Sequence, residues 1–238
     1  MDLDEKYCWV SERVFNQFPG YVRGVVAAYG LTNGDAPEEL VSLLRATEVS
    51  VRKQLSLDTL AQHPRIVAWR EAYRAFGAKP SKFRPSMEAM TRRVLRDERL
   101  PPINTLVAIG NVVSLRHLVP AGGHAIDVIA GSMELRPATG EEQFIPLDAE
   151  AVENPLPGEI IFVEGNTVLT RRWTWRQAKH TLIVPTTTAA EFNVDGLPPV
   201  SVAEVEEVCR EIMELTERFC GGTTHYEILS REKPRLRL

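Results

Sequence analysis

The sequence lacks several features that mark whole classes of protein. Its 238 residues contain three cysteines (Cys8, Cys209 and Cys220), and these form neither a CxxC pair nor a disulfide framework. No segment approaches the roughly 18 uninterrupted apolar residues that a membrane-spanning helix needs. The acidic N-terminus has no basic-then-apolar signal region. The sequence therefore predicts a protein of the reducing cytoplasm that is neither secreted nor embedded in a membrane.

The motifs of several common enzyme classes are also absent. There is no GxxxxGK[ST] loop, no GxGxxG after a strand, no HExxH and no GxSxG. The five histidines share no metal-ligand spacing on one element, so we expect no metal site and no cofactor. Nucleotide hydrolysis, zinc-dependent hydrolysis and triad-type acyl transfer are accordingly disfavoured.

Basic residues are concentrated in a few segments, although the formal net charge is −4. Residues 64–99 contain ten basic and four acidic side chains, and residues 171–180 add four basic side chains and no acid. Such segregation can place a basic surface on an acidic protein, and phosphate binding needs only the local surface. The competing interpretation is that the helices within residues 64–96 have solvated basic faces.

Hydrophobic periodicity predicts helices at both ends of the chain and strands between them. We expect helices beginning at Asp35, after Pro64, at Ser86, at Asn104 and at Ser201, the last with a capping box to Glu204. Strands are expected over residues 133–136, 143–145, 160–163, 167–170, 182–184 and 192–194.

The pattern of these elements indicates an α+β fold with N-terminal helices, a central mixed β-sheet and a C-terminal helix. We expect a single domain over residues 1–238. Residues 1–77 form its helical N-terminal part, residues 78–200 its core, and residues 201–238 a closing helix with a basic tail.

Three segments are difficult to explain by packing alone: residues 73–86, 100–127 and 169–177. Their most specific blocks are Pro-Ile-Asn with Asn-Val-Val in residues 102–113, and His-Ala-Ile-Asp at residues 124–127. Together they resemble the tRNA-binding and editing domain of the phenylalanyl-tRNA synthetase beta subunit. They look most like the free-standing relatives of that domain, and the likeness to the synthetase domain covers about residues 86–200.

This resemblance implies binding of the acylated 3′ end of a tRNA and hydrolysis of the ester of a wrongly attached amino acid. The pocket asparagine of the family falls on Asn111 and its pocket histidine on His124, which are the two expected catalytic residues. Two features depart from the family. Gly110 stands where threonine is usual. The family has a glycine-rich segment with an acidic residue nearby, and this chain has the Arg171–Gln177 stretch in its place.

The chemistry of an aminoacyl ester is compatible with these residue types. Its hydrolysis needs a positioned water and a polarised carbonyl, and neutral donors and acceptors such as Asn111 and His124 can provide both. Each also has a structural interpretation, because a loop histidine is often a hydrogen-bonding residue and a buried asparagine must be satisfied by the backbone or by a ligand. Asn104 is expected only to cap its helix.

Further candidates for substrate or tRNA binding lie in two segments. The tryptophans can stack on terminal bases and the arginines can neutralise phosphates. Alternatively, the two tryptophans share one face of a strand and belong to the core, and the first segment is a solvated loop. The candidates are Lys79, Lys82, Arg84 and Ser86, together with Arg171, Arg172, Trp173, Trp175, Arg176 and Gln177.

The leading hypothesis is a cytoplasmic trans-editing deacylase that acts on mischarged tRNA as a second sieve in translation quality control. One alternative is a non-catalytic tRNA- or RNA-binding module of the same fold. Another is a small-molecule pocket that keeps the fold without the nucleic acid.

Overall fold

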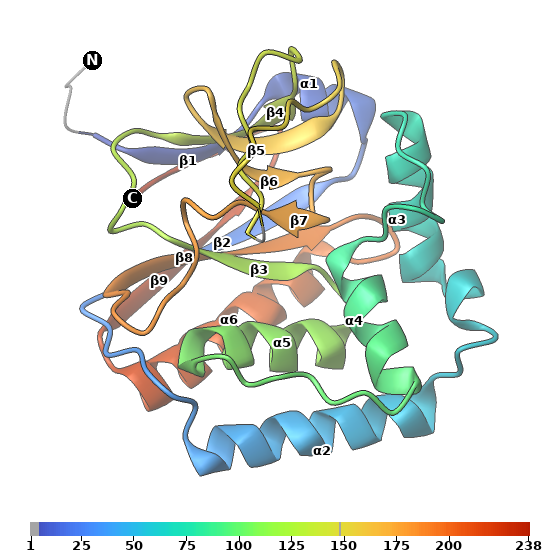
Figure 1. The fold of residues 1–238 in the computed structure, drawn as a ribbon, viewed down its shortest axis with the longest axis vertical. Helices are drawn as coiled ribbons and strands as arrows, with labels where there is room; N and C mark the ends of the chain where they lie inside the picture. Colours follow the sequence, from blue (N-terminus) through green and yellow to red (C-terminus); the bar gives the residue numbers. More distant parts are fainter. Residues whose placement is uncertain (1–4, 148) are drawn as a thin grey trace.

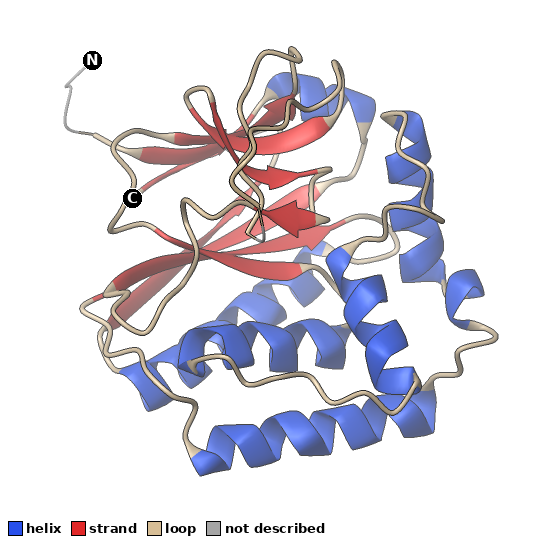
Figure 2. Ribbon diagram, in the orientation of Figure 1, coloured by secondary structure: helices blue, strands red, loops and turns tan. Residues whose placement is uncertain are grey.

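The protein is built from two stacked β-sheets, one of which is covered by helices on its outer face (Figure 1). The computed structural model describes residues 5–147 and 149–238. Figure 2 shows the helices gathered below and beside the strands, so the expected α+β class is confirmed.

The first sheet has six strands in the order β10-β1-β4-β5-β6-β7. It is mixed, because β1 pairs with β4 in parallel and the other pairs are antiparallel. The expected hairpin around Gly165 is confirmed and forms β5 and β6. The strands are β1 (Tyr7–Val10), β4 (Met133–Pro137), β5 (Ile160–Glu164), β6 (Thr167–Arg171), β7 (Arg176–Gln177) and β10 (Arg235–Arg237).

The second sheet has four antiparallel strands in the order β3-β8-β2-β9. Its alternate side chains face in opposite directions, so that one face of β8 packs on helices and the other faces the first sheet. The strands are β2 (Val22–Tyr29), β3 (Ala121–Ala125), β8 (Ala189–Gly196) and β9 (Thr223–Leu229).

Helices α5 and α6 lie against the second sheet, and α2 packs outside α5 (Figure 1). Gly24 on β2 permits this close approach, because a β-carbon there would lie 2.3 Å from Cys209 Sγ on α6. The helices are α1 (Glu12–Gln17), α2 (Glu38–Gln54), α3 (Pro64–Ala75), α4 (Ser86–Leu95), α5 (Thr105–His117) and α6 (Val202–Cys220), with a 3-10 turn at Leu60–Gln62.

The predicted helix caps are partly confirmed. Asn104 caps α5, since its Oδ1 accepts from the backbone N–H of Val107 at 3.0 Å. Ser201 and Glu204 form the expected capping box of α6. The start of α2 was placed too early, because the helix begins at Glu38 after Pro37. Among the described residues, no helix combines the length and apolarity that crossing a bilayer requires.

Several expectations about strands were wrong. The N-terminal part is not wholly helical, because it contributes β1 and β2, and the tail contributes β9 and β10. The single central sheet is two sheets. Residues 182–184 form no strand, and residues 143–145 form only isolated bridges. Residues 1–4 of the expected N-terminal part lie outside the described residues.

The physical reason for missing β2 is its burial on both faces. Seven of its eight residues are buried, so the segment shows none of the polar–apolar alternation that distinguishes a half-buried strand. A short apolar run of this kind does not separate a central strand from a buried helical turn.

Candidate functional site

A cavity of about 150 Å³ lies between β3 of the second sheet and the β6–β7 hairpin of the first. Its walls come from segments that are far apart in the chain. The structure brings together six of the residues expected to form a site, namely Ser86, His124, Trp173, Trp175, Arg176 and Gln177.

His124 on β3 is the most buried of the polar candidates, with 3% of its surface exposed. Its Nδ1 is 2.6 Å from the hydroxyl of Thr181, and its Nε2 is 3.2 Å from the hydroxyl of Thr170. Burial, followed by the charges of Arg23 and His180, lowers the pKa of His124 to about 3. The imidazole is therefore neutral at physiological pH and offers one donor and one acceptor.

Gln177 holds the β7 end of the hairpin against β3. Its Nε2 donates to the carbonyl oxygens of Gly123 at 3.0 Å and Thr181 at 3.1 Å, and lies 3.3 Å from His124 Nδ1. Within the described residues its amide oxygen has no hydrogen-bond partner. Gln177 thus fixes the position of the imidazole and leaves an acceptor beside it.

The turn that joins β6 to β7 has an unusual backbone. Arg172 and Trp173 both have positive φ angles, of 47° and 64°, a region that L-residues other than glycine seldom adopt. The turn is held in place by the Ser86 N–H, which donates to the carbonyl of Thr174 at 2.9 Å. Strain of this kind, about 1–3 kcal/mol for each residue, accumulates where a site requires a particular side-chain position.

The two tryptophans of this turn have different environments. Trp173 is 2% exposed and belongs to an aromatic cluster with Phe18 and Trp69, so its main surface is unavailable for stacking on a base. Trp175 is half-buried, and its ring meets Phe83 edge-on at 4.9 Å. Both tryptophans line the cavity, but Trp175 keeps the larger surface that a ligand could contact.

The arginines of this segment are not equivalent. Arg171 is buried, and its guanidinium donates to both carboxylate oxygens of Glu159, at 2.9 Å each, and to Glu153 at 2.8 Å. The expectation that Arg171 contacts a phosphate is therefore corrected, because its donors serve an internal ion pair. Arg172 is also buried, and its guanidinium carbon lies 3.7 Å from the ring centre of Phe83 and 4.4 Å from that of Trp175.

The remaining candidates lie outside this cavity. Asn111 is half-buried on α5 and does not belong to the lining, so the structure does not join it to His124. Lys79 lines a separate cleft of about 390 Å³ with Arg70 and Arg74. Lys82 is exposed, and the Arg84 Nε lies 3.9 Å from the carboxylate of Glu88.

A row of buried polar residues behind the cavity was not expected. Glu191, Asn193 and Asp195 alternate along β8 on the face that looks toward the first sheet, and Arg23 on β2 lies opposite Asp195. Asn193 also lines the cavity. Their alternation with Phe192 and Val194 was the available signal, but such a pattern is equally typical of a strand with a solvated face.

Burial raises the pKa of Glu191 to about 7, with Arg23 and Asn193 acting in the opposite direction and Asp195 adding to the rise. The ordinary value for the group is 4.5, so the fold favours the protonated carboxyl. The contribution of the protonated Glu191 carboxyl to the free energy of unfolding is complete below about pH 4.5 and is lost as the pH rises through 7.

We therefore expect Glu191→Gln to flatten this pH dependence. Relative to the variant, the wild type should lose about 3 kcal/mol of unfolding free energy between pH 4.5 and pH 8, since each unit of pKa shift is worth about 1.4 kcal/mol. Urea denaturation of both proteins across this range measures the difference. Parallel stability profiles would show that Glu191 ionises normally.

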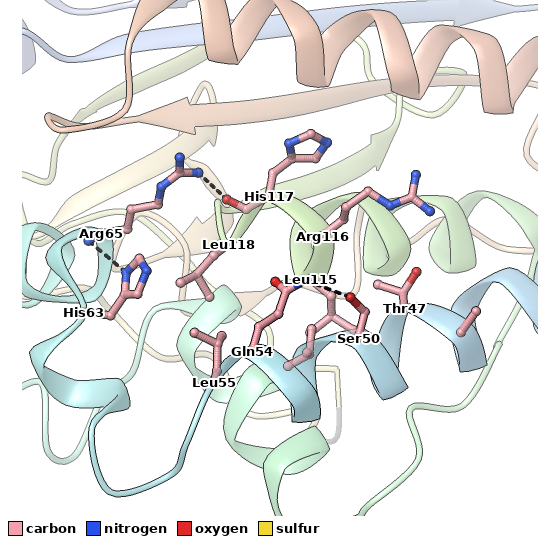
Figure 3. A pocket seen from close by; sticks show the side chains of 12 residues that line it. Thr47, Ser50, Gln54, Leu55, His63, Arg65, Leu115, Arg116, His117 and Leu118 are labelled. Carbon is pink, nitrogen blue, oxygen red and sulfur yellow. Dashed lines mark hydrogen bonds between the residues drawn. The ribbon is translucent and has the colours of Figure 1, made fainter.

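A larger cavity, of about 470 Å³, lies elsewhere, between α2, the start of α3 and the end of α5 (Figure 3). Arg65 in its wall donates to the carbonyl of His117 and pairs with Glu204. Arg116 and His117 both pair with Glu211. The two arginines of this cavity are thus already paired with carboxylates of α6, whereas the smaller cavity is lined by six of the residues that the sequence predicted.

Over residues 5–147 and 149–238, no three histidine, cysteine, aspartate or glutamate side chains are grouped so that they could hold a metal ion.

Comparison with known proteins gives a consistent picture. The B3/4 domain family matches residues 68–228. The phenylalanine–tRNA ligase beta subunit of Mycoplasma genitalium is 31% identical over 101 residues, which are 42% of this chain. The match covers 12% of that subunit, so the chain spans about an eighth of this curated relative.

A structural comparison finds the crystal structure of an N-terminal fragment of the phenylalanyl-tRNA synthetase beta-subunit from Pyrococcus horikoshii. The superposition has a TM-score of 0.45 at 13% sequence identity, and it covers 91% of this chain and 49% of the fragment.

Proposed function

The chain belongs to the B3/4 domain family and is a relative of the phenylalanyl-tRNA synthetase beta-subunit domain, and we propose that it is a trans-editing aminoacyl-tRNA deacylase of the cytoplasm. In this proposal the cavity receives the acylated 3′ end of a tRNA. The observation that carries it is the convergence of His124, Trp175, Arg176 and Gln177 on one cavity, because these residues come from the segments with the family resemblance.

The size of the cavity supports an aminoacyl group as its occupant. A volume of about 150 Å³ corresponds to about five water molecules, whereas sites for drug-sized ligands occupy roughly 300–1,000 Å³. The amino acid would enter the cavity, and the terminal nucleoside would remain at its mouth. A cavity this small excludes larger side chains, as the second sieve of an editing scheme requires.

The proposed reaction needs no covalent nucleophile. A water adds to the ester carbonyl, the bond between the carbonyl carbon and the ribose oxygen breaks, and that oxygen takes up a proton from the attacking water to become the ribose hydroxyl. His124 is neutral, so its role is to orient the water or to donate a hydrogen bond to the carbonyl oxygen. Gln177 keeps the imidazole in place.

The tRNA itself would be held outside the cavity. Trp175 presents a half-buried ring at the wall, where a terminal base can stack for about 1–3 kcal/mol. The cleft lined by Arg70, Arg74 and Lys79 offers the cations of Arg74 and Lys79 to a backbone phosphate, whereas Arg70 is paired with Glu88.

Deacylation assays with a panel of mischarged tRNAs test the proposal. The wild type should release amino acid faster than buffer, and His124→Ala should be about 10²–10³-fold slower, since an aligned hydrogen-bond donor at the carbonyl is lost. His225→Ala is the matched control, because this exposed histidine stacks on Tyr29 at the far edge of the second sheet. Release at the buffer rate, or equal rates for the wild type and His124→Ala, would contradict a hydrolytic function.

The second candidate is a tRNA-binding module without hydrolysis. Two observations favour it: both ring nitrogens of His124 are already hydrogen-bonded to threonines, and Asn111 does not line the cavity. Salt-sensitive tRNA binding without release of amino acid would select this alternative.

A further inference from the structure

The polar row behind the cavity contains more acid than base. Glu191 and Asp195 on β8 and Arg23 on β2 are at most 2% exposed, so two carboxyl groups face one guanidinium between the sheets. Tyr21 donates to Asp195 Oδ1, and the Arg23 Nε lies 3.8 Å from the same oxygen. The pairing of Arg23 with Asp195 therefore leaves Glu191 without a cation of its own.

Glu191 is incompletely satisfied. Its Oε1 accepts from Asn193 Nδ2 at 3.1 Å, whereas its Oε2 has no hydrogen-bond partner among the described residues. Atoms of Arg23 and Asp195 in the same cluster also lack partners, so the row does not satisfy itself. A buried carboxylate without partners is costly, and such a group calls for a ligand, a proton or a water.

Glu191 adjoins the cavity on two sides. It is the cross-strand partner of His124 on β3, and it is two residues from Asn193 on the same face of β8. Both neighbours line the cavity. Directly opposed residues of neighbouring strands have β-carbons only about 4.5–5.5 Å apart, so the Glu191 carboxyl lies immediately behind the cavity wall.

The cavity wall next to Glu191 includes the side-chain amides of Asn193 and Gln177. The amide N–H groups of Asn193 and Gln177 are directed to Glu191 and to backbone carbonyls, which leaves their amide oxygens for a ligand. Arg176 also lines the cavity, and its guanidinium lies by the ring of Trp175 and 4.0 Å from the carboxylate of Glu153. A ligand group that supplies several donors and a positive charge fits this wall.

We propose that the cavity binds a primary ammonium group of its ligand, against Glu191 and the amide oxygens of Asn193 and Gln177. An ammonium supplies three donors and the missing positive charge. The inference rests on the proposed function, in which the group is the free α-ammonium of the aminoacyl ester. An N-acylated amino acid is then excluded, because it has neither the charge nor the donors.

The test uses a non-hydrolysable probe, 3′-alanylamino-3′-deoxyadenosine, and its N-acetyl derivative, with binding measured by calorimetry on the full chain. The wild type should bind the free amine roughly ten- to a hundredfold more tightly, as hydrogen bonds to a charged group imply. Glu191→Gln should lose this preference. Glu206→Gln, the same change on the exposed face of α6, should keep it.

Equal binding of both probes by the wild type, no binding of either probe, or an undiminished preference in a folded Glu191→Gln protein would overturn the ammonium site. Deacylation of free and N-acetylated aminoacyl-tRNA at equal rates would also overturn it, while leaving the deacylase proposal intact. Selective binding of the free amine without any hydrolysis would support the ammonium site and reject the deacylase.

Discussion

Replacing Glu159 with glutamine is expected to lower the free energy of unfolding by about 3–5 kcal/mol, because it removes the buried carboxylate that the guanidiniums of Arg171 and Arg172 share. Arg171 and Glu159 are each less than 10% exposed and share two hydrogen bonds of 2.9 Å. Glu159 also accepts from the backbone N–H of Arg172 at 3.2 Å, so the pair anchors the strained turn. Urea denaturation of the variant measures the loss.

A matched control is Glu153→Gln, which removes the other carboxylate partner of Arg171. Glu153 is 42% exposed, so its loss should cost less than about 1 kcal/mol. The double variant Arg171→Met/Glu159→Leu should recover only part of the stability, because it removes one buried ion pair but leaves the guanidinium of Arg172, 3.5 Å from Glu159 in the wild type, without that carboxylate. A loss below 1 kcal/mol for Glu159→Gln would contradict the internal role assigned to Arg171 and return it to the candidates for phosphate contact.

Replacing Trp173 with alanine is expected to destabilise the fold by a similar amount, about 3–5 kcal/mol, as truncation of a large buried aromatic does. The indole lies with its ring centre 4.8 Å from those of Phe18 and Tyr21 and 5.0 Å from that of Trp69. Thermal and urea unfolding of the variant measure the effect.

Trp175→Ala separates this structural role from ligand contact. Since Trp175 is only half-buried, the variant should lose less than half as much stability as Trp173→Ala. It should weaken tRNA binding by the equivalent of about 1–3 kcal/mol if a base stacks on the ring. If both variants lost stability equally and tRNA binding by Trp175→Ala were unchanged, Trp175 would be a core residue as well.

The local elements of this fold were predictable where the signal lies within a few residues. Asn104 was expected to cap α5 after two prolines, and the hairpin at Gly165 was expected from its turn residues flanked by apolar runs. These features depend on backbone geometry over one turn, which the adjacent residues determine.

The features that depend on contacts between distant elements were harder to predict from the sequence. A strand such as β2, buried on both faces, shows no alternation, and the polar row of β8 has the pattern of a solvated face although the first sheet covers it. Whether Arg171 meets a phosphate or Glu159 depends on a pairing between positions twelve residues apart, across the open end of the β5–β6 hairpin. His124 was indicated by the family resemblance, whereas its partners Thr170 and Thr181 carried no signal of their own.

The most direct test of a ligand site at His124 is the NMR signal of its imidazole during titration with 3′-alanylamino-3′-deoxyadenosine. Binding in the cavity between the sheets should shift the His124 ring signals and the side-chain amide signals of Gln177, while those of exposed His225 stay unchanged. No shift at His124 would contradict the placement of the site. Shifts confined to His63 and His117, which line the 470 Å³ cavity between α2, α3 and α5, would also contradict it.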